Sequence, residues 1–197
     1  MTGPNDADED VERAEKKMFI QTETTPNPAT LKFLPGQEVM SHGTANFVDL
    51  AAAERSPLAT RIFGVDGVTG VFFGSDFITV TKGAVDWNDI KPAVLGSIMD
   101  HFTSGDPIVA ASAESTESEE DDDGVVMQIK ELLETRVRPA VAQDGGDIIF
   151  HGFEDGIVHL EMHGACAGCP SSTMTLKHGI ENMLRHYIPE VMEVRQI

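Results

Sequence analysis

Two cysteines, Cys166 and Cys169, are the residues of this 197-residue chain best suited to chemistry, and it contains no others. They lie in the segment His-Gly-Ala-Cys-Ala-Gly-Cys-Pro, between an expected strand and an expected helix. Pro170 fits the first turn of a helix, because its missing N–H would have no partner there. Cys169 would then lie at a helix N-terminus, where free N–H groups and the helix dipole favour an anionic sulfur. The spacing therefore predicts thiolate chemistry.

The number of protein ligands that each kind of site needs distinguishes three possible functions of such a cysteine pair. A redox disulfide needs only these two cysteines, whereas a structural zinc site usually needs four ligands and would have to recruit His163 and His178. His178 lies well along the expected helix, which disfavours zinc. A [2Fe–2S] or [4Fe–4S] cluster is normally held by four cysteines, which two chains around a two-fold axis would supply. A dithiol–disulfide redox protein remains the main alternative to a cluster protein, although proline follows the pair instead of lying within it.

Several further segments carry a family resemblance. The C-terminal half resembles the C-terminal domain of NifU-like proteins in Arg138-Pro139-Ala-Val141, Asp144-Gly-Gly-Asp147 and Gly164-Ala-Cys-Ala-Gly-Cys-Pro-Ser-Ser172. The N-terminal half resembles the Nfu N-terminal domain in Thr25-Pro-Asn-Pro28, Leu31-Lys-Phe33, Pro35-Gly36 and Gly70-Val-Phe-Phe-Gly-Ser-Asp76. The two matches cover residues 18 to 197 in the order expected of Nfu-type iron–sulfur scaffold and carrier proteins.

This resemblance implies a function and a site. It implies that the protein binds a [4Fe–4S] cluster, shared between two subunits through Cys166 and Cys169 of each, and transfers it to apo-proteins. The implied partners are an upstream assembly scaffold, apo iron–sulfur client proteins and, in the loaded state, a second copy of the chain. Such a protein is a carrier and not an enzyme. The sequence agrees, since it contains no serine–histidine–acid order, no glycine-rich phosphate loop and no HExxH helix.

The amino-acid composition limits which binding partners and which cellular compartment are expected. The net charge is −19 and the 14 basic residues are scattered, so nucleic acid is not an expected partner. No apolar run approaches the roughly 20 residues that span a bilayer, so a membrane is not expected either. Residues 1–17 carry six acidic and three basic side chains, unlike a signal or transit peptide, which predicts a cytoplasmic protein. Met18 is a second candidate start, and the sequence does not distinguish it from Met1.

Residues 107–124 have the composition of a linker. They contain seven acidic residues, four serine or threonine residues, and no basic or aromatic residue. Such a segment buries too little apolar surface to fold, and charge repulsion keeps it extended. The predicted organisation is a disordered extension at 1–17, a domain at 18–106, an acidic flexible linker at 107–124 and a cluster-binding domain at 125–197. The linker predicts that the two domains orient independently.

The residue pattern predicts two small α+β domains. In the first, strands are expected at 19–24, 31–34, 68–73 and 77–82, with helices at 57–63 and from Asp86 to just before Gly105. In the second, the expected order is α-β-β-α-β, with a helix at 125–142, strands at 148–153 and 157–162, a helix after the cysteines and a strand at 191–194. The first domain contains no cysteine, and its aromatic residues Phe72, Phe73 and Phe77 are expected in the core. It is therefore predicted to be an accessory domain for client contact or stability.

Overall fold

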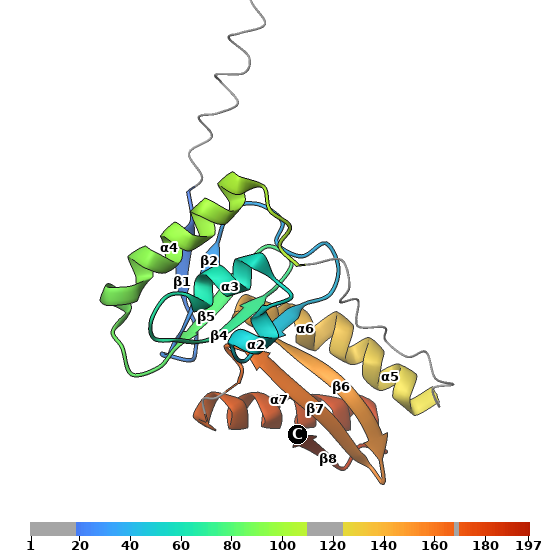
Figure 1. The fold of residues 1–197 in the computed structure, drawn as a ribbon. Coiled ribbons are helices and arrows are strands. Elements are labelled where there is room, and N and C mark those ends of the chain that lie inside the picture. The colour runs from blue at the N-terminus through green and yellow to red at the C-terminus, as the bar shows by residue number, and fades with distance from the viewer. Residues whose placement is uncertain (1–18, 110–123, 168–169) are drawn as a thin grey trace, which may run out of the picture.

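The computed structural model describes residues 19–109, 124–167 and 170–197, with the side chains of 170–172 excepted (Figure 1). The predicted N-terminal extension, most of the predicted linker and Cys169 lie outside the described residues. Two α+β domains with separate hydrophobic cores make up the described chain, which confirms the fold class. None of the helices in these residues is long and apolar enough to cross a membrane.

The N-terminal domain is built on an antiparallel five-stranded sheet of order β1-β2-β5-β4-β3. Its strands are β1 (Gln21–Thr24), β2 (Thr30–Leu34), β3 (Ala45–Phe47), β4 (Val68–Phe73) and β5 (Ile78–Lys82). Gly74, Ser75 and Asp76 form the hairpin turn between β4 and β5, in which the Gly74 N–H donates to the Phe77 carbonyl at 2.9 Å. The short strand β3 was not predicted from the sequence.

The helices of this domain are α2 (Leu50–Ala53), α3 (Pro57–Phe63) and α4 (Trp87–Ser104). The Asp86 side chain accepts from the Asn88 N–H, and Gly105 closes α4 with a φ of 72°, so both predicted ends of this helix are confirmed. One face of the sheet packs against α3 and α4 to form the core. The main contributors are Phe33, Phe47, Leu58, Ile62, Val71, Phe73, Ile78, Val80, Val94 and Ile98.

The C-terminal domain begins with a helical stretch of three parts, α5 (Gly124–Leu132), η1 (Leu133–Val137) and α6 (Arg138–Gln143). The sequence predicts one continuous helix over 125–142, and the π-helical turn η1 is the difference. Pro139 explains it, because proline has no N–H to donate and its ring collides with the carbonyl four residues earlier. A π-helical turn relieves that collision, and the Arg138 N–H donates to the Leu133 carbonyl five residues back.

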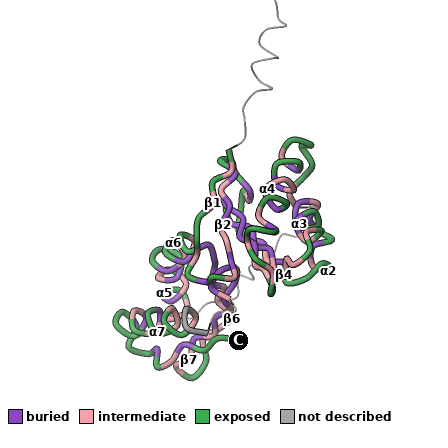
Figure 2. Tube along the Cα trace, turned by 90° about the vertical axis from the view of Figure 1, so that its left-hand side faces the viewer, coloured by how far each residue is buried: buried purple, intermediate pink, exposed green. Residues whose placement is uncertain are grey.

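The rest of this domain is a three-stranded sheet of order β6-β7-β8 and one long helix. Its elements are β6 (Gly146–Glu154), β7 (Ile157–Gly164), α7 (Pro170–Tyr187) and β8 (Glu193–Gln196), which confirms the α-β-β-α-β order. Strands β6 and β7 form an antiparallel hairpin, and β8 runs parallel to β7. Figure 2 shows buried positions concentrated along the strands of both domains and exposed positions on the outer sides of the helices.

The two domains are in contact, contrary to the predicted independence of their orientations. Alternate side chains of a strand point to opposite faces of its sheet. In the N-terminal sheet, the face turned away from α3 and α4 carries Thr30, Lys32, Phe72 and Thr79, which are only 1–7% exposed. This face lies against the end of the C-terminal domain where β6 begins and β7 ends (Figure 1). Phe72 therefore belongs to the contact between the domains and not to the N-terminal core, whereas Phe73 is in that core as predicted.

Candidate functional site

Cys166 lies two residues beyond β7 and is buried, with 6% of its surface exposed. Its sulfur packs against Gly146, where an added Cβ would lie 2.6 Å from Sγ. Its carbonyl accepts a hydrogen bond from the Thr173 hydroxyl of α7 at 3.0 Å. The preceding Ala165 N–H donates to the Gly145 carbonyl at 3.0 Å. The first half of the cysteine turn is therefore held between the start of β6 and the first turns of α7.

Cys169, the second predicted site residue, lies outside the described residues, so its distance from Cys166 is not part of the structure's description. Helix α7 begins at Pro170, the residue that the sequence places in a first helical turn. This start puts the position of Cys169 in the chain immediately before the helix.

The surroundings of Cys166 keep its sulfur protonated. Burial raises the pKa of this thiol to about 12, and the carboxylates of Asp144 and Asp147 add to the effect. A thiol with a raised pKa is a poor nucleophile and a poor metal ligand until it loses its proton. The thiolate predicted from the sequence is therefore not the form of Cys166 in this conformation.

A largely apolar pocket of about 640 Å³ opens beside Cys166. One wall comes from η1 and α6, which contribute Val137 and Val141, and the other comes from α7, which contributes Leu176 and Ile180. The N-terminal domain reaches its rim through Pro26. The pocket thus gives the cysteine turn an open side, facing away from the β-hairpin.

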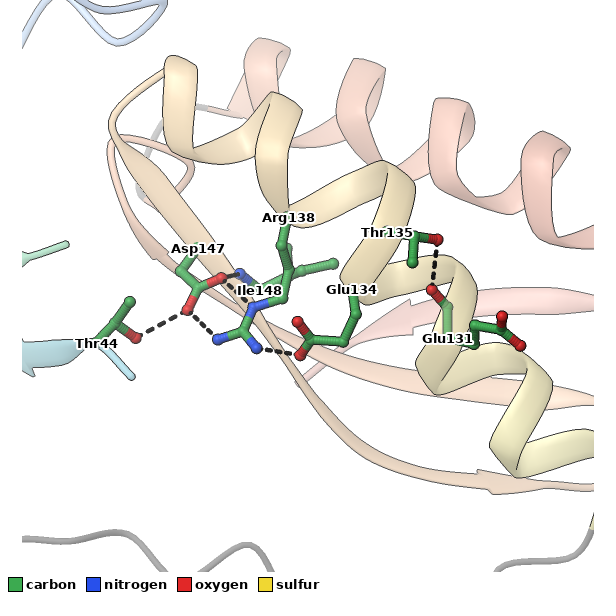
Figure 3. Close-up of polar contacts among 7 residues, drawn as sticks. All are labelled: Thr44, Glu131, Glu134, Thr135, Arg138, Asp147 and Ile148. Carbon is green, nitrogen blue, oxygen red and sulfur yellow. Dashed lines mark hydrogen bonds and ion pairs between the residues drawn. The ribbon is translucent and has the colours of Figure 1, made fainter. Parts of the chain in front are cut away.

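Asp147 is the centre of a network that fixes the loop next to Cys166 (Figure 3). Arg138 donates to it twice, from Nε to Oδ1 and from Nη2 to Oδ2, each at 2.9 Å. The Ile148 N–H donates to Oδ1 at 2.8 Å, and the Thr44 hydroxyl of the N-terminal domain donates to Oδ2 at 2.8 Å. Arg138 also pairs with Glu134, and these partners raise the pKa of its guanidinium. The sequence does not predict the pairing of Asp147 with Arg138.

Two further side chains of the N-terminal domain bind the loops around Cys166. The Asn27 amide donates from Nδ2 to the Ala167 carbonyl at 3.1 Å. The Lys32 ammonium donates to the carbonyls of Ala142 and Gln143, at 3.0 and 3.1 Å, where α6 ends. Sequence reasoning missed both residues, since it predicted an accessory domain for client contact or stability and no contact with the cysteine turn.

Within the described residues, Cys166 has no set of neighbouring side chains that could complete a metal site. His163 lies in β7 with Nε2 2.8 Å from a carboxylate oxygen of Glu161 and its ring against Phe72. His178 is exposed on α7. No group of three or more histidine, cysteine, aspartate or glutamate side chains gathers as a metal site in the part of the chain that the structure describes. The zinc alternative therefore gains no ligand from these residues.

Fold and site together define a class of protein: two α+β domains, of which the second presents a cysteine turn between a β-hairpin and a helix. Residues 20–105 match the family described as scaffold protein Nfu/NifU N terminal. Residues 129–195 match the family described as NifU-like domain. The chain belongs to the Nfu/NifU family.

Similar proteins are known from several organisms. The chain is 56% identical over 183 residues to the human NFU1 iron-sulfur cluster scaffold homolog, mitochondrial, a match that covers 91% of this chain and 72% of the relative. It is 55% identical over 186 residues to the protein of that name in Drosophila willistoni, covering 92% and 64%. It is 55% identical over 188 residues to the Arabidopsis thaliana NifU-like protein 4, mitochondrial, covering 92% and 66%. The chain thus spans 64% to 72% of the lengths of these relatives.

Among solved structures, the solution NMR structure of a NifU-like protein from Saccharomyces cerevisiae is similar, with 25% identity and a TM-score of 0.45. The match covers 57% of this chain and 94% of the yeast chain.

The predicted cytoplasmic location is wrong by these comparisons. The relatives from human, fly and plant are all named as mitochondrial, which points away from the cytoplasm. The prediction depended on the acidic composition of residues 1–17. That composition describes one short segment and carries no information on where the two folded domains work.

Proposed function

We propose that this protein is an iron–sulfur cluster scaffold and carrier that binds a [4Fe–4S] cluster between two subunits and transfers it to apo-proteins. The observation that carries the proposal is the cysteine turn of a NifU-like domain, in a chain 56% identical over 183 residues to a relative named as an iron–sulfur cluster scaffold. The proposed ligands are Cys166 and Cys169 of each subunit. Two chains then supply the four thiolates that a cluster normally requires.

In this proposal the cluster is cargo, received from an upstream scaffold and passed to client proteins. Binding must remove the proton of Cys166, because only the thiolate ligates iron. It must also move the Cys166 side chain outward, since a cysteine that is only 6% exposed cannot be shared with a second subunit. Release then follows by ligand exchange, in which client thiolates replace Cys166 and Cys169 one at a time. The protein binds and transfers without making or breaking bonds of an organic substrate, so it is proposed as a carrier and not an enzyme.

The domain organisation proposed with this function keeps the division drawn from the sequence. The segment 125–197 holds the cluster, and 18–106 supports the cysteine turn through Asn27, Lys32 and Thr44. The segment 107–124 is the tether. The raised pKa of Cys166 does not distinguish this proposal from the redox alternative, because iron ligation and thiol–disulfide exchange both need the thiolate.

Replacement of either cysteine tests the proposed ligands. Cys166→Ala and Cys169→Ala should each abolish cluster binding, because the dimer loses two of its four thiolates. The measurement is iron and labile sulfide after anaerobic reconstitution, together with the mass of the assembly. His178→Ala is the matched control and should load normally, since this exposed residue is a ligand only in the zinc alternative.

Three results would contradict this assignment. The first is a full cluster retained by either cysteine variant. The second is stoichiometric zinc without labile sulfide in the wild-type protein. The third is a colourless wild-type protein that forms a reversible disulfide under the same conditions, which would favour the redox alternative.

A further inference from the structure

The turn between β1 and β2 presents Asn27 in a fixed orientation. Asn27 is 5% exposed and lies between Pro26 and Pro28, whose rings restrict the backbone. Its Oδ1 accepts from the Ala29 N–H at 3.0 Å, and its own N–H donates to the Thr25 hydroxyl at 3.2 Å. These bonds lie within the N-terminal domain, so they set the direction of the amide before any contact with the other domain.

The remaining polar atom of this side chain, Nδ2, donates to the carbonyl of Ala167 at 3.1 Å. Ala167 directly follows Cys166 in the sequence. The Ala167 N–H donates to the Gly164 carbonyl at 3.1 Å, and the Cys166 carbonyl accepts from Thr173. With the bond from the Ala165 N–H to the Gly145 carbonyl, the described half of the cysteine turn is held three times from within its own domain. It is held once, through Asn27, from the N-terminal domain.

Lys32 strengthens the contact that brings Asn27 to the turn. Its ammonium is nearly buried and donates to two carbonyls at the end of α6, where the helix dipole favours a positive charge. Gly145, with a φ of 81°, follows this end, and an added Cβ there would lie 2.7 Å from Thr79. Close packing at Gly145 and the hydrogen bonds of Lys32 therefore hold the N-terminal sheet against the loop between α6 and β6. From this position Asn27 reaches the turn that contains Cys166.

We propose that Asn27 is a positioning residue that holds the cysteine turn in its buried conformation and thereby slows loading of the cluster. This inference rests on the proposed carrier function. Loading requires Cys166 to move outward, and the Ala167 carbonyl cannot move outward until its bond to Asn27 breaks. The N-terminal domain, which contains no cysteine, therefore acts on cluster loading through the backbone that follows Cys166.

Asn27→Asp tests this role with little other change. Aspartate keeps the oxygen that accepts from Ala29 but replaces the Nδ2 donor by an oxygen that faces the Ala167 carbonyl. Asn27→Ala removes both bonds, and Asn182→Asp makes the same change of atoms at an exposed position on α7. The Trp87 indole donates to the Pro28 carbonyl at 3.3 Å, and Trp87 is the only tryptophan, so its fluorescence reports whether the β1–β2 turn is intact.

Two rates are measured in the full-length chain. The first is alkylation of apo-protein in a Cys169→Ala background, where Cys166 is the one remaining thiol. The second is uptake of the cluster during anaerobic reconstitution, followed by its visible absorbance, with both cysteines present. Asn27→Asp and Asn27→Ala should each raise both rates about fivefold, the effect of losing one hydrogen bond, while Asn182→Asp leaves them unchanged. Trp87 fluorescence should stay as in the wild type for Asn27→Asp.

Each other outcome overturns the inference in its own way. An unchanged alkylation rate means that Asn27 does not hold the turn. Faster alkylation with unchanged uptake means that the held turn does not control loading. If Asn27→Ala is fast and Asn27→Asp behaves as wild type, the Nδ2 donor is not responsible. A wild-type chain that takes up no cluster, while Asn27→Asp still speeds alkylation, refutes the carrier function and the loading role together.

Discussion

At the scale of single residues, Asp147 carries more contacts than any sequence pattern suggests. Its carboxylate is 4% exposed and accepts hydrogen bonds from Arg138, from the Ile148 N–H and from Thr44 of the other domain. Through Arg138 it connects α6 to the start of β6, and through Thr44 it connects the C-terminal domain to the N-terminal domain. Removing a buried carboxylate with this many hydrogen-bond partners destabilises the protein, because the donors remain without their acceptor.

Asp147→Ala should therefore destabilise the C-terminal domain by about 2–3 kcal/mol, less than a fully buried pair would cost since Arg138 is partly exposed. The measurement is the free energy of unfolding in urea, followed by circular dichroism. Glu134→Ala is the control, because it removes the other, exposed partner of Arg138 and should cost no more than about 0.5 kcal/mol. Equal losses for the two variants would mean that Asp147 is not the main partner of Arg138.

His101 gives the N-terminal domain a predictable dependence on pH. It is fully buried in α4, and neither ring nitrogen has a hydrogen-bond partner in the described residues. Burial lowers the pKa of His101 from its ordinary value of 6.5, and Arg61 adds to this, while Asp106 opposes it. The folded state thus binds fewer protons than the unfolded state below about pH 6.5, so the free energy of unfolding falls as the pH decreases.

The expected slope is at most about 1.4 kcal/mol per pH unit, the value for one proton. Unfolding of the full chain at pH 7.5 and at pH 5.0 measures it, with His101→Leu as the variant that removes the titrating group. The Asp106 carboxyl has its pKa lowered from 3.8, so its contribution is lost only below about pH 4, outside this window. An unchanged slope in His101→Leu would show that another group is responsible.

At the scale of elements, glycines decide how closely the loops around Cys166 approach one another. Gly146 opens β6, and an added Cβ there would lie 2.6 Å from both Cys166 Sγ and the His163 carbonyl. Gly164 closes β7 with a φ of 63°, and its Cβ would lie 2.7 Å from the Gly145 carbonyl. These approaches bring the first residue pair of the hairpin, Gly146 with Gly164, directly beneath the cysteine turn.

Gly146→Ala should displace this turn, because backbone atoms cannot yield as a flexible side chain can. The expected cost is about 1–3 kcal/mol of the free energy of unfolding, together with weaker cluster binding. Gly152→Ala is the matched control in the same strand, where an added Cβ meets nothing within 4 Å. A Gly146→Ala protein with wild-type stability and wild-type cluster content would show that the turn tolerates the shift.

Sequence signals predicted elements well where they were local. The ends of α4 follow from Asp86 and Gly105, and the start of α7 follows from Pro170. The π-helical turn η1 was missed because a helical pattern of apolar residues does not show how the chain accommodates Pro139. Strand β3 and helix α2 were missed because three or four residues carry too little periodicity.

The contact between the domains was missed for a different reason. It pairs residues more than 100 positions apart, such as Asn27 with Ala167 and Lys32 with Ala142, and no local pattern encodes such a pair. One signal was present. Val71, Phe72 and Phe73 are consecutive apolar residues in a strand, and a strand that is apolar on both faces is covered on both faces. The cysteine ligands, in contrast, were proposed from spacing and family resemblance alone, with Cys169 outside the described residues.

At the scale of the whole molecule, the two domains have separate hydrophobic cores but contact each other through their surfaces. The residues of the C-terminal core that the structure describes lie between Val125 and Val194. The N-terminal sheet, however, buries one face only because the other domain covers it. The net charge of −19 does not favour the contact, although the Lys32 ammonium contributes to it at the end of α6. Close packing and a few directed hydrogen bonds make the contact instead.

A fragment of residues 124–197 should therefore fold alone and assemble a [4Fe–4S] cluster at about one per two chains, because it holds the whole core and both proposed ligands. A fragment of residues 18–106 should bind none, since it contains no thiol. Circular dichroism, iron and sulfide analysis and mass measurement check both. The C-terminal fragment also lacks Asn27, so it should take up the cluster faster than the full chain does. If it folded but stayed free of cluster under conditions that load the full chain, the N-terminal domain would be required for assembly itself, and Cys166 and Cys169 would not be sufficient ligands.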